Sequence, residues 1–191
     1  MDDGELVSDA RGGDVGAFEL LVRRYHSMAY RVALLSGAGD DADDVVQEAF
    51  VRAFHALGSF RVGGTFRVWL LQIVVNQARN LHRARSRRTH LTARVAGLRE
   101  TREEALWREG ADPESHTLHN ERQRMLWAAL RGLAEKDRQV LGCRFLLELS
   151  EPETAAVLGW PRGSVKSRTS RALSRLRTRL ETVVGEVGDY A

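Results

Sequence analysis

The sequence predicts an all-α protein made of two small helical domains joined by a flexible linker. Apolar residues recur every three or four positions along most of the chain, as on a helix with one buried face, and no sheet is expected. This periodicity weakens after about residue 86, where charges of both signs mix and helix breakers occur. The breakers are Gly97, Gly110 and Pro113. We therefore expect domains over residues 1–88 and 120–191, with residues 89–119 as the linker.

Three helices are expected in the first domain. One follows an N-cap at Asp14, one follows the acidic pair Asp40 and Asp41, and one begins near Thr65 after a glycine turn. Their apolar stripes are, in order, Phe18, Leu21, Val22 and Tyr25; Val45, Val46, Ala49, Phe50, Ala53 and Phe54; and Phe66, Trp69, Leu70, Ile73 and Val74. The three stripes should face one core.

The second domain should begin with two more helices and end in a helix-turn-helix. The first two stripes are Met125, Leu126, Ala129, Leu130 and Leu133, and then Val140, Leu141 and Phe145. After them Ser150 can cap a helix whose first turn tolerates Pro152, and Gly159 permits the left-handed turn that ends this helix.

The last helix of this motif has a basic face. It should bury Val165, Ala172, Leu173 and Leu176 and expose Arg162, Lys166, Ser167, Ser170 and Arg171. Cations and short hydroxyl groups on one face suit phosphates and base edges in a DNA major groove. The alternative interpretation is a helical hairpin used for protein contact.

The formal net charge of +3 hides an uneven distribution of charge. Residues 61–99 carry 9 basic and no acidic side chains, and residues 161–180 carry 7 basic and no acidic ones, whereas residues 1–60 carry 5 basic and 11 acidic ones. Two basic segments free of acids predict two contacts with a polyanion. For either segment alone, a solvated arginine-rich helix face is the alternative.

Several functional classes are not expected. No stretch approaches the roughly 20 apolar residues of a membrane span, and the N-terminus is acidic, so we expect no membrane insertion and a cytoplasmic location. The single cysteine, Cys143, should be a small buried residue. The histidines are scattered, and neither a phosphate-cradling glycine loop nor a nucleophile motif is present. We therefore expect no enzyme, no catalytic residues, no metal and no cofactor.

Five runs, in this order, resemble the extracytoplasmic-function sigma factors of bacterial RNA polymerase. They are AFELLVRRYHSMAY, DDADDVVQEAF and TFRVWLLQIVVNQARN in what would be region 2, and LAEKDRQVLGCRFLLELS and LGWPRGSVKSRTSRALSRLR in region 4. The resemblance covers about residues 14–88 and 120–180. It implies an alternative sigma factor, and as partners it implies core RNA polymerase, promoter DNA and an anti-sigma factor.

The resemblance assigns the docking of core polymerase to one helix face. The residues are Asp41, Asp44, Val45, Gln47 and Glu48. They would bind the beta-prime clamp helices, while region 4 would reach the beta flap. An acidic face with apolar neighbours suits a basic coiled coil. Without the resemblance, the same residues would be interpreted as a solvated first turn of a helix.

The resemblance also assigns minus-ten recognition to the loop before the third helix, where an unstacked base is captured, and to that helix. The residues are Phe60, Arg61, Asn76, Arg79 and Arg83, with Arg85, Arg87 and Arg88 as further backbone contacts. The amide of Asn76 can donate to and accept from a base edge. Phe66 and Trp69 are expected in the core. The chain departs from the family pattern at Leu71, Gln72 and Asn80.

Minus-thirty-five recognition is assigned to the helix-turn-helix. The residues are Arg144, Lys166, Ser167, Ser170 and Arg171, with Arg168 as a phosphate clamp. The family sometimes has an aromatic residue at the position of Ser170, so the base preference is expected to differ. The alternative function is a helix-turn-helix regulator that binds an operator without core polymerase and dimerises through its N-terminal helices.

Overall fold

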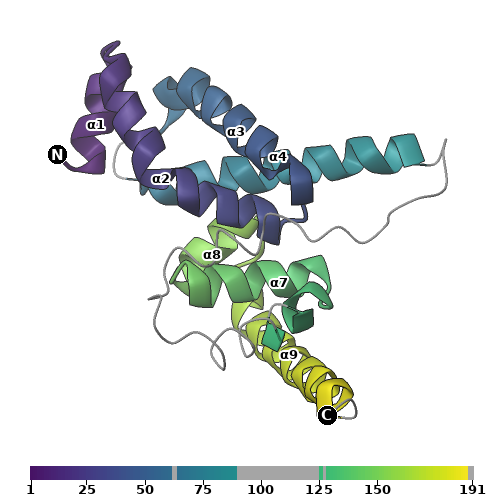
Figure 1. Cartoon of the computed structure of the whole chain (residues 1–191). Coiled ribbons are helices and arrows are strands. Elements are labelled where there is room, and N and C mark those ends of the chain that lie inside the picture. The colour runs from purple at the N-terminus through teal and green to yellow at the C-terminus, as the bar shows by residue number, and fades with distance from the viewer. Residues whose placement is uncertain (62–63, 90–124, 127, 189–191) are drawn as a thin grey trace, which may run out of the picture.

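The computed structural model describes residues 1–61, 64–89, 125–126 and 128–188. All regular elements in these ranges are helical, as predicted (Figure 1). The predicted linker lies outside the described residues from position 90 onward. Among the described helices, none is both long enough and apolar enough to cross a membrane.

Four α-helices lie in the described residues 1–61 and 64–89. They are α1 (Asp3–Arg11), α2 (Val15–Leu35), α3 (Ala42–Ala56) and α4 (Phe66–Thr89), with 3-10 turns at Gly39–Asp41 and Leu57–Ser59. The predicted N-cap of α2 is confirmed, because the Asp14 carboxylate accepts hydrogen bonds from the backbone N–H of Gly16 at 2.8 Å and of Ala17 at 3.2 Å.

Helix α1 was not among the predicted helices. It is nine residues long and begins with a capping box, in which Asp2 and Glu5 each accept a hydrogen bond from the other's backbone N–H at 2.8 Å. Its buried side chains are Leu6, Val7 and Ala10. Three apolar positions are too few for periodicity to detect, although the spacing of Asp2 and Glu5 was a usable signal.

The C-terminal part contains helical residues 125–126 and 128–131, followed by α7 (Glu135–Leu141), a π-helical turn (Gly142–Leu146), α8 (Glu151–Leu158) and α9 (Ser164–Gly188). The helix-turn-helix punctuation is confirmed. Ser150 and Glu153 form a capping box at the start of α8, and Gly159 ends that helix with φ 65°, in the left-handed region that favours glycine.

Some predicted core positions are wrong. Phe54, Phe145 and Leu173 have exposed fractions of 41%, 57% and 43%. Phe145 lies within the π-helical turn, whose wider winding rotates it away from the face that buries Val140. Leu173 lies one residue, about 100° of helix rotation, beyond the buried Ala172. Cys143 is buried, as predicted.

The two parts of the chain pack against each other, and their buried side chains form one hydrophobic cluster. Helix α4 lies against α8, and the end of α2 lies against α7 and the π-helical turn (Figure 1). At the second contact, a Cβ atom at Gly142 would overlap the Leu35 side chain. We call these contacts, α4 with α8 and Leu35 with Gly142, the interdomain junction.

Candidate polymerase and DNA interfaces

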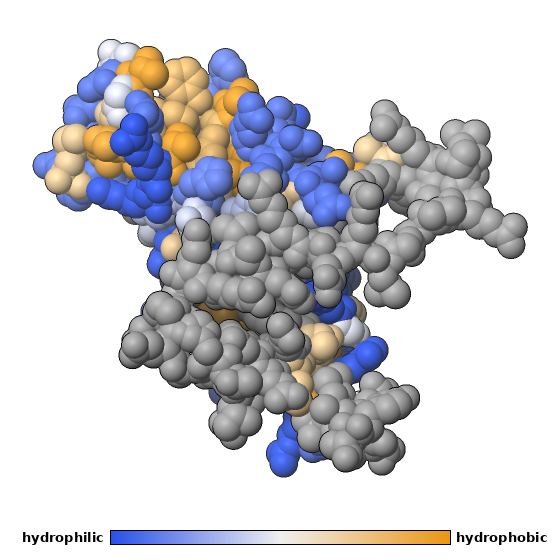
Figure 2. All heavy atoms as spheres, viewed as in Figure 1, coloured by the Kyte–Doolittle hydropathy of each residue, from blue (hydrophilic) through white to orange (hydrophobic). Residues whose placement is uncertain are grey.

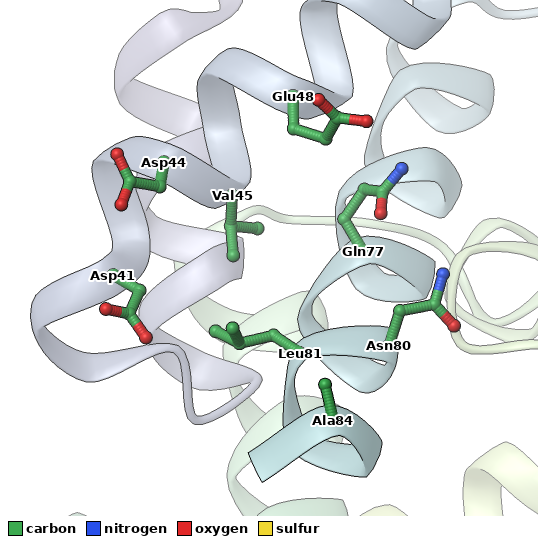
Figure 3. A pocket seen from close by; sticks show the side chains of 8 residues that line it. All are labelled: Asp41, Asp44, Val45, Glu48, Gln77, Asn80, Leu81 and Ala84. Atoms are coloured by element: carbon green, nitrogen blue, oxygen red, sulfur yellow. The ribbon is translucent and has the colours of Figure 1, made fainter.

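Four of the five residues assigned to polymerase docking line one groove between α3 and α4. Asp41, Asp44, Val45 and Glu48 form one wall. The wall on α4 is formed by Gln77, Asn80, Leu81 and Ala84, and Figure 3 shows the Leu81 side chain extending toward Val45. Gln47 is exposed on α3 but does not line the groove. The groove thus combines an acidic rim with an apolar floor.

Arg52 links the two walls of this groove. Its Nε donates to the Glu48 carboxylate at 2.8 Å. With the Gln77 amide turned so that its oxygen faces Arg52, the same guanidinium also donates to Gln77. Figure 3 shows Glu48 pointing toward Gln77. Sequence reasoning missed the α4 wall, although the spacing of Gln77, Leu81 and Ala84 by four and three residues was available as a signal.

The loop before α4 divides the minus-ten candidates into buried and exposed ones. Phe60 is only 9% exposed and packs on Phe66 and Trp69, with ring centroids 5.9 Å and 5.2 Å away. Phe66 lies in the core as expected, and Trp69 is half-buried. Arg61 is exposed. In this structure, therefore, the Phe60 ring packs between the loop and the core, and it has no exposed face on which a base could stack.

The other minus-ten candidates form a stripe along α4. Asn76, Arg79 and Arg83 follow each other at spacings of three and four residues, which places them on one side of the helix. Asn76 and Arg83 are exposed, whereas Arg79 is half-buried. The side chains of the last three arginines on α4 lie outside the described part. They are Arg85, Arg87 and Arg88.

Arg79 lies at the interdomain junction. Its Nη2 donates to the carbonyl oxygen of Leu158 at 2.8 Å. Nearby, Arg67 of α4 forms an ion pair of 3.0 Å with Glu153 of α8, and both side chains are 28% exposed. Hydrogen bonds from Ser150, and then the Arg67 guanidinium, lower the pKa of Glu153 below its usual value. The loop residues Phe60 and Arg61 line a hollow whose opposite wall is α8.

The minus-thirty-five candidates of α9 form one exposed face. Lys166, Ser167, Ser170 and Arg171 are all exposed. Arg171 Nε donates to the carbonyl oxygen of Ser167 at 3.1 Å, which holds its stem along the helix. This face lies opposite the buried Val165 and Ala172, as the sequence predicted. Figure 2 shows patches of apolar residues lying between hydrophilic residues on the surface of the N-terminal helices.

Arg168 and Arg144 are held differently from the exposed face. The Arg168 guanidinium lies over the Trp160 ring, 4.7 Å from its centroid. Its Nε is buried and has no hydrogen-bond partner within the described residues. Arg144 donates to the carbonyl oxygen of Leu149, in the segment that leads into α8. Both side chains are therefore fixed by contacts inside the helix-turn-helix unit. The contribution of Trp160 was not foreseen from the sequence.

Family models match both parts of the chain. Residues 21–88 match Sigma-70 region 2, and residues 123–176 match Sigma-70 region 4. The ECF RNA polymerase sigma-E factor of Escherichia coli (strain K12) is 36% identical over 96% of this chain and 97% of its own length. Its counterpart in Haemophilus influenzae is 30% identical over 96% and 98% of the two chains.

Solved structures agree with this assignment. CnrH, solved in complex with the cytosolic domain of CnrY, aligns with a TM-score of 0.66 and 30% identity over 94% of this chain and 97% of its own. RpoE from Bartonella quintana, solved with the anti-sigma factor NepR, aligns with a TM-score of 0.68 and 22% identity over 87% and 98%, a likeness of fold. Neither the relatives nor the family models favour the operator-binding alternative. The chain belongs to the extracytoplasmic-function sigma factors, a family of transcription factors and not an enzyme class, and it acts as an alternative sigma factor that directs transcription.

Proposed function

We propose that this sigma factor docks on core RNA polymerase through the α3–α4 groove, and that the same two-helix unit presents α4 to the minus-ten element. The observation that carries the proposal is that one helix, α4, supplies both a groove wall, with Gln77 and Leu81, and the stripe that contains Asn76 and Arg83. Docking would therefore fix the position of the DNA-reading stripe relative to the polymerase.

The groove suits a basic helical partner. Asp41, Asp44 and Glu48 supply negative charge along the rim, and Val45 and Leu81 supply apolar surface between the helices. A coiled coil with cations beside an apolar seam matches both features, and we assign this role to the beta-prime clamp helices. Region 4 is proposed to reach the beta flap. This assignment depends on the family resemblance alone.

The two DNA elements are assigned to separate surfaces. Arg61, Asn76, Arg79 and Arg83 would hold the melted non-template strand, with Phe60 shaping the loop from below. The exposed α9 face and Arg144 would read the minus-thirty-five duplex, with Arg168 as a phosphate clamp. The residues of that face are Lys166, Ser167, Ser170 and Arg171. Melting would be driven by these contacts without catalysis.

In the described arrangement, α8 of the C-terminal part covers the proposed minus-ten surface of α4 and its loop, and we call this the closed form. The hollow beside Phe60 and Arg61 is walled by α8, and Arg79 is bonded to Leu158. The melted strand and α8 would thus compete for the same side of α4. We propose that binding to core polymerase and promoter DNA separates the two domains, whose boundaries we place at residues 1–88, 89–119 and 120–191.

We propose that the protein works in the cytoplasm, where it binds the polymerase and the promoter. An anti-sigma factor is proposed as a further partner there. The family resemblance supports it, as does the solved complex of RpoE from Bartonella quintana with the anti-sigma factor NepR. Such a partner would occlude the α3–α4 groove and the DNA-binding surfaces.

Run-off transcription tests the proposed function. Purified core polymerase is given a library of random upstream sequences, with and without this protein, and with Asp44→Ala and Arg171→Ala as variants. We expect transcripts only with the protein, from templates that share two motifs at a fixed spacing, and fewer with either variant. Duplex binding by the protein alone, with no gain for the polymerase, would instead support the operator-binding alternative.

A further inference from the structure

Helix α1 precedes the segment that matches region 2, and its two ends contact different parts of the fold. At its start, Asp3 forms an ion pair of 2.5 Å with Arg24 of α2 and accepts a hydrogen bond from the Tyr25 hydroxyl. Burial, and then this hydrogen bond, raise the pKa of Tyr25 to about 12, because both favour the protonated phenol. These contacts anchor α1 to α2.

The other end of α1 holds the loop that leads to α4. Arg11, the last residue of the helix, donates from Nε to the carbonyl oxygen of Leu57 at 2.9 Å and from Nη2 to that of Gly58 at 3.3 Å. Nη2 also donates to the carbonyl oxygen of Phe60. The guanidinium carbon lies 6.0 Å from the centroid of the Phe60 ring. One side chain thus binds three of the backbone carbonyl groups of the turn at residues 57–60.

These bonds set the direction in which the chain leaves the turn. The ring of Phe60 is fixed between Phe66 and Trp69, and Arg11 fixes its carbonyl group. Because the ring and the carbonyl group of Phe60 are both held, the position of the next residue, the exposed Arg61, is restricted as well. A planar guanidinium carries donors on three nitrogen atoms and can bind several carbonyl groups at once. A lysine has a single nitrogen atom and cannot reach the same carbonyl groups together.

We propose that Arg11 is a positioning residue for minus-ten recognition. It acts through the turn at residues 57–60, and its own donors are occupied by backbone carbonyl groups, so it needs no contact with DNA. The inference depends on the proposed function, because it assumes that the loop and α4 meet the melted strand. It extends the DNA-reading unit to a helix that lies before the matched region 2 segment.

The test compares Arg11→Met and Arg11→Lys with Arg24→Met in complete holoenzyme. Arg24→Met is the matched control, since it also removes an arginine that anchors α1 but touches no loop carbonyl. Three quantities are measured on a promoter selected from the library: affinity for core polymerase, permanganate reactivity of the melted strand, and the base preference of each promoter motif after reselection.

For Arg11→Met we expect unchanged affinity for core polymerase and a loss of open complex of about tenfold or more, as for hydrogen bonds made by a charged group. Base preference should relax in the minus-ten motif and stay unchanged in the minus-thirty-five motif, an asymmetry that general destabilisation would not produce. Arg11→Lys should fold, retain one carbonyl bond and show an intermediate loss. Arg24→Met should open the promoter like the wild type.

Two outcomes would overturn the inference alone: Arg11 variants that open and read the promoter like the wild type, or an equal loss in Arg24→Met. Thermal unfolding of each variant fixes a temperature at which all are folded for the comparison. A wild-type protein that yields no polymerase-dependent transcript would overturn the proposed function itself, and the role of Arg11 with it.

Discussion

Arg79 of α4 donates a hydrogen bond of 2.8 Å to the backbone carbonyl oxygen of Leu158, the last residue of α8. The donor is a candidate contact to the minus-ten strand, and the acceptor belongs to the helix-turn-helix. Arg67 and Glu153 make an ion pair across the same junction. Because the Nη2 donor that is bonded to Leu158 is not available to a phosphate, we expect closure of the junction to weaken DNA binding by Arg79.

A methyl group at Gly142 should open the junction. The Cβ of Gly142→Ala would overlap the Leu35 side chain, and overpacking of this kind costs about 1–3 kcal/mol. Such a cost shifts the ratio of closed to open protein by about 5- to 150-fold. Small-angle scattering of the free protein should therefore show a larger radius of gyration for this variant.

The matched control for this experiment is the double variant Leu35→Ala with Gly142→Ala, because the smaller side chain makes room for the methyl group. It should return to the compact scattering profile. An unchanged profile for Gly142→Ala, with its helix content intact by circular dichroism, would contradict the closed arrangement. So would a double variant as expanded as the single one.

Glu153 should make the protein sensitive to acid. Its folded-state pKa is lowered from the usual 4.5, first by hydrogen bonds from Ser150 and further by Arg67. A lowered pKa means that its stabilising contribution is complete above about pH 4.5 and is lost as the pH falls through the folded-state value. Thermal unfolding between pH 7 and pH 3 should show a smaller loss of Tm for Glu153→Gln than for the wild type.

Glu19→Gln is the control for the acid experiment, because Glu19 pairs with Arg23 at 2.6 Å on the open surface of α2. Exposed pairs of this kind contribute roughly 0–1 kcal/mol, so its pH profile should follow the wild type. If Glu153→Gln and Glu19→Gln gave the same profile as the wild type, the junction and the cap of α8 would not be a source of acid sensitivity.

Local signals made much of the fold predictable. Asp14, Ser150 and Gly159 act within one helical turn of their own position, so their capping roles could be recognised from the sequence and are confirmed by the hydrogen bonds and the positive φ. The apolar stripe of α4 was predictable for the same reason, since Phe66 and Leu70 repeat at helical spacing.

Contacts between distant residues were not predictable. Arg67 and Glu153 are 86 positions apart, and Arg11 is 46 to 49 positions from the carbonyl groups that it binds. No periodicity or cap reports such a pair, because it depends on how finished helices stack. The same limit applies to the candidate site. The family resemblance pointed to Asp44 on α3, and helical spacing could group Leu81 with Gln77 on one face of α4, but only the packing of α3 on α4 brings that face opposite Asp44.

Cys143 should behave as a structural residue and not as an oxidant sensor. Burial raises the pKa of its thiol from 9.0 to about 12, so the thiol is less ionised at pH 7 than a free thiol. Labelling with a chromogenic disulfide should be slow in the folded protein and fast in urea. Rapid labelling of the folded protein at pH 7 would contradict this.

The same pKa shift has a consequence for stability at alkaline pH. The unfolded chain loses the Cys143 proton as the pH passes 9, whereas the native state keeps it until about 12. The free energy of unfolding should therefore fall across this interval. Cys143→Ala should show a smaller fall in urea titrations at pH 8 and pH 10, and an equal fall would remove the thiol as its cause.

The acidic rim of the α3–α4 groove should determine the affinity for core polymerase. Asp44→Asn removes one rim charge, and we expect affinity to fall about five- to tenfold, with a weaker dependence on salt, since rim charges act mainly through association. Asp43→Asn is the matched control: Asp43 is exposed in the same first turn but does not line the groove. Competition for labelled core polymerase measures both, and equal losses would point to helix stability instead of the groove.

Arg168 and Arg171 should make different contributions to minus-thirty-five binding. Arg168 is held over Trp160 at the edge of the exposed face, whereas Arg171 lies on that face beside Ser167 and Ser170. Loss of a phosphate contact weakens binding to all sequences alike and lowers the salt slope by about one, whereas loss of a base contact costs about 1–3 kcal/mol at one position. Arg168→Ala should show the first pattern and Arg171→Ala the second, when holoenzyme binding to single-base promoter variants is titrated at several salt concentrations. Trp160→Ala should weaken binding to all sequences alike but leave the salt slope unchanged, because the guanidinium loses its platform while its charge remains. A change of base preference in Arg168→Ala, or a uniform loss in Arg171→Ala, would reverse the assignment of the two arginines.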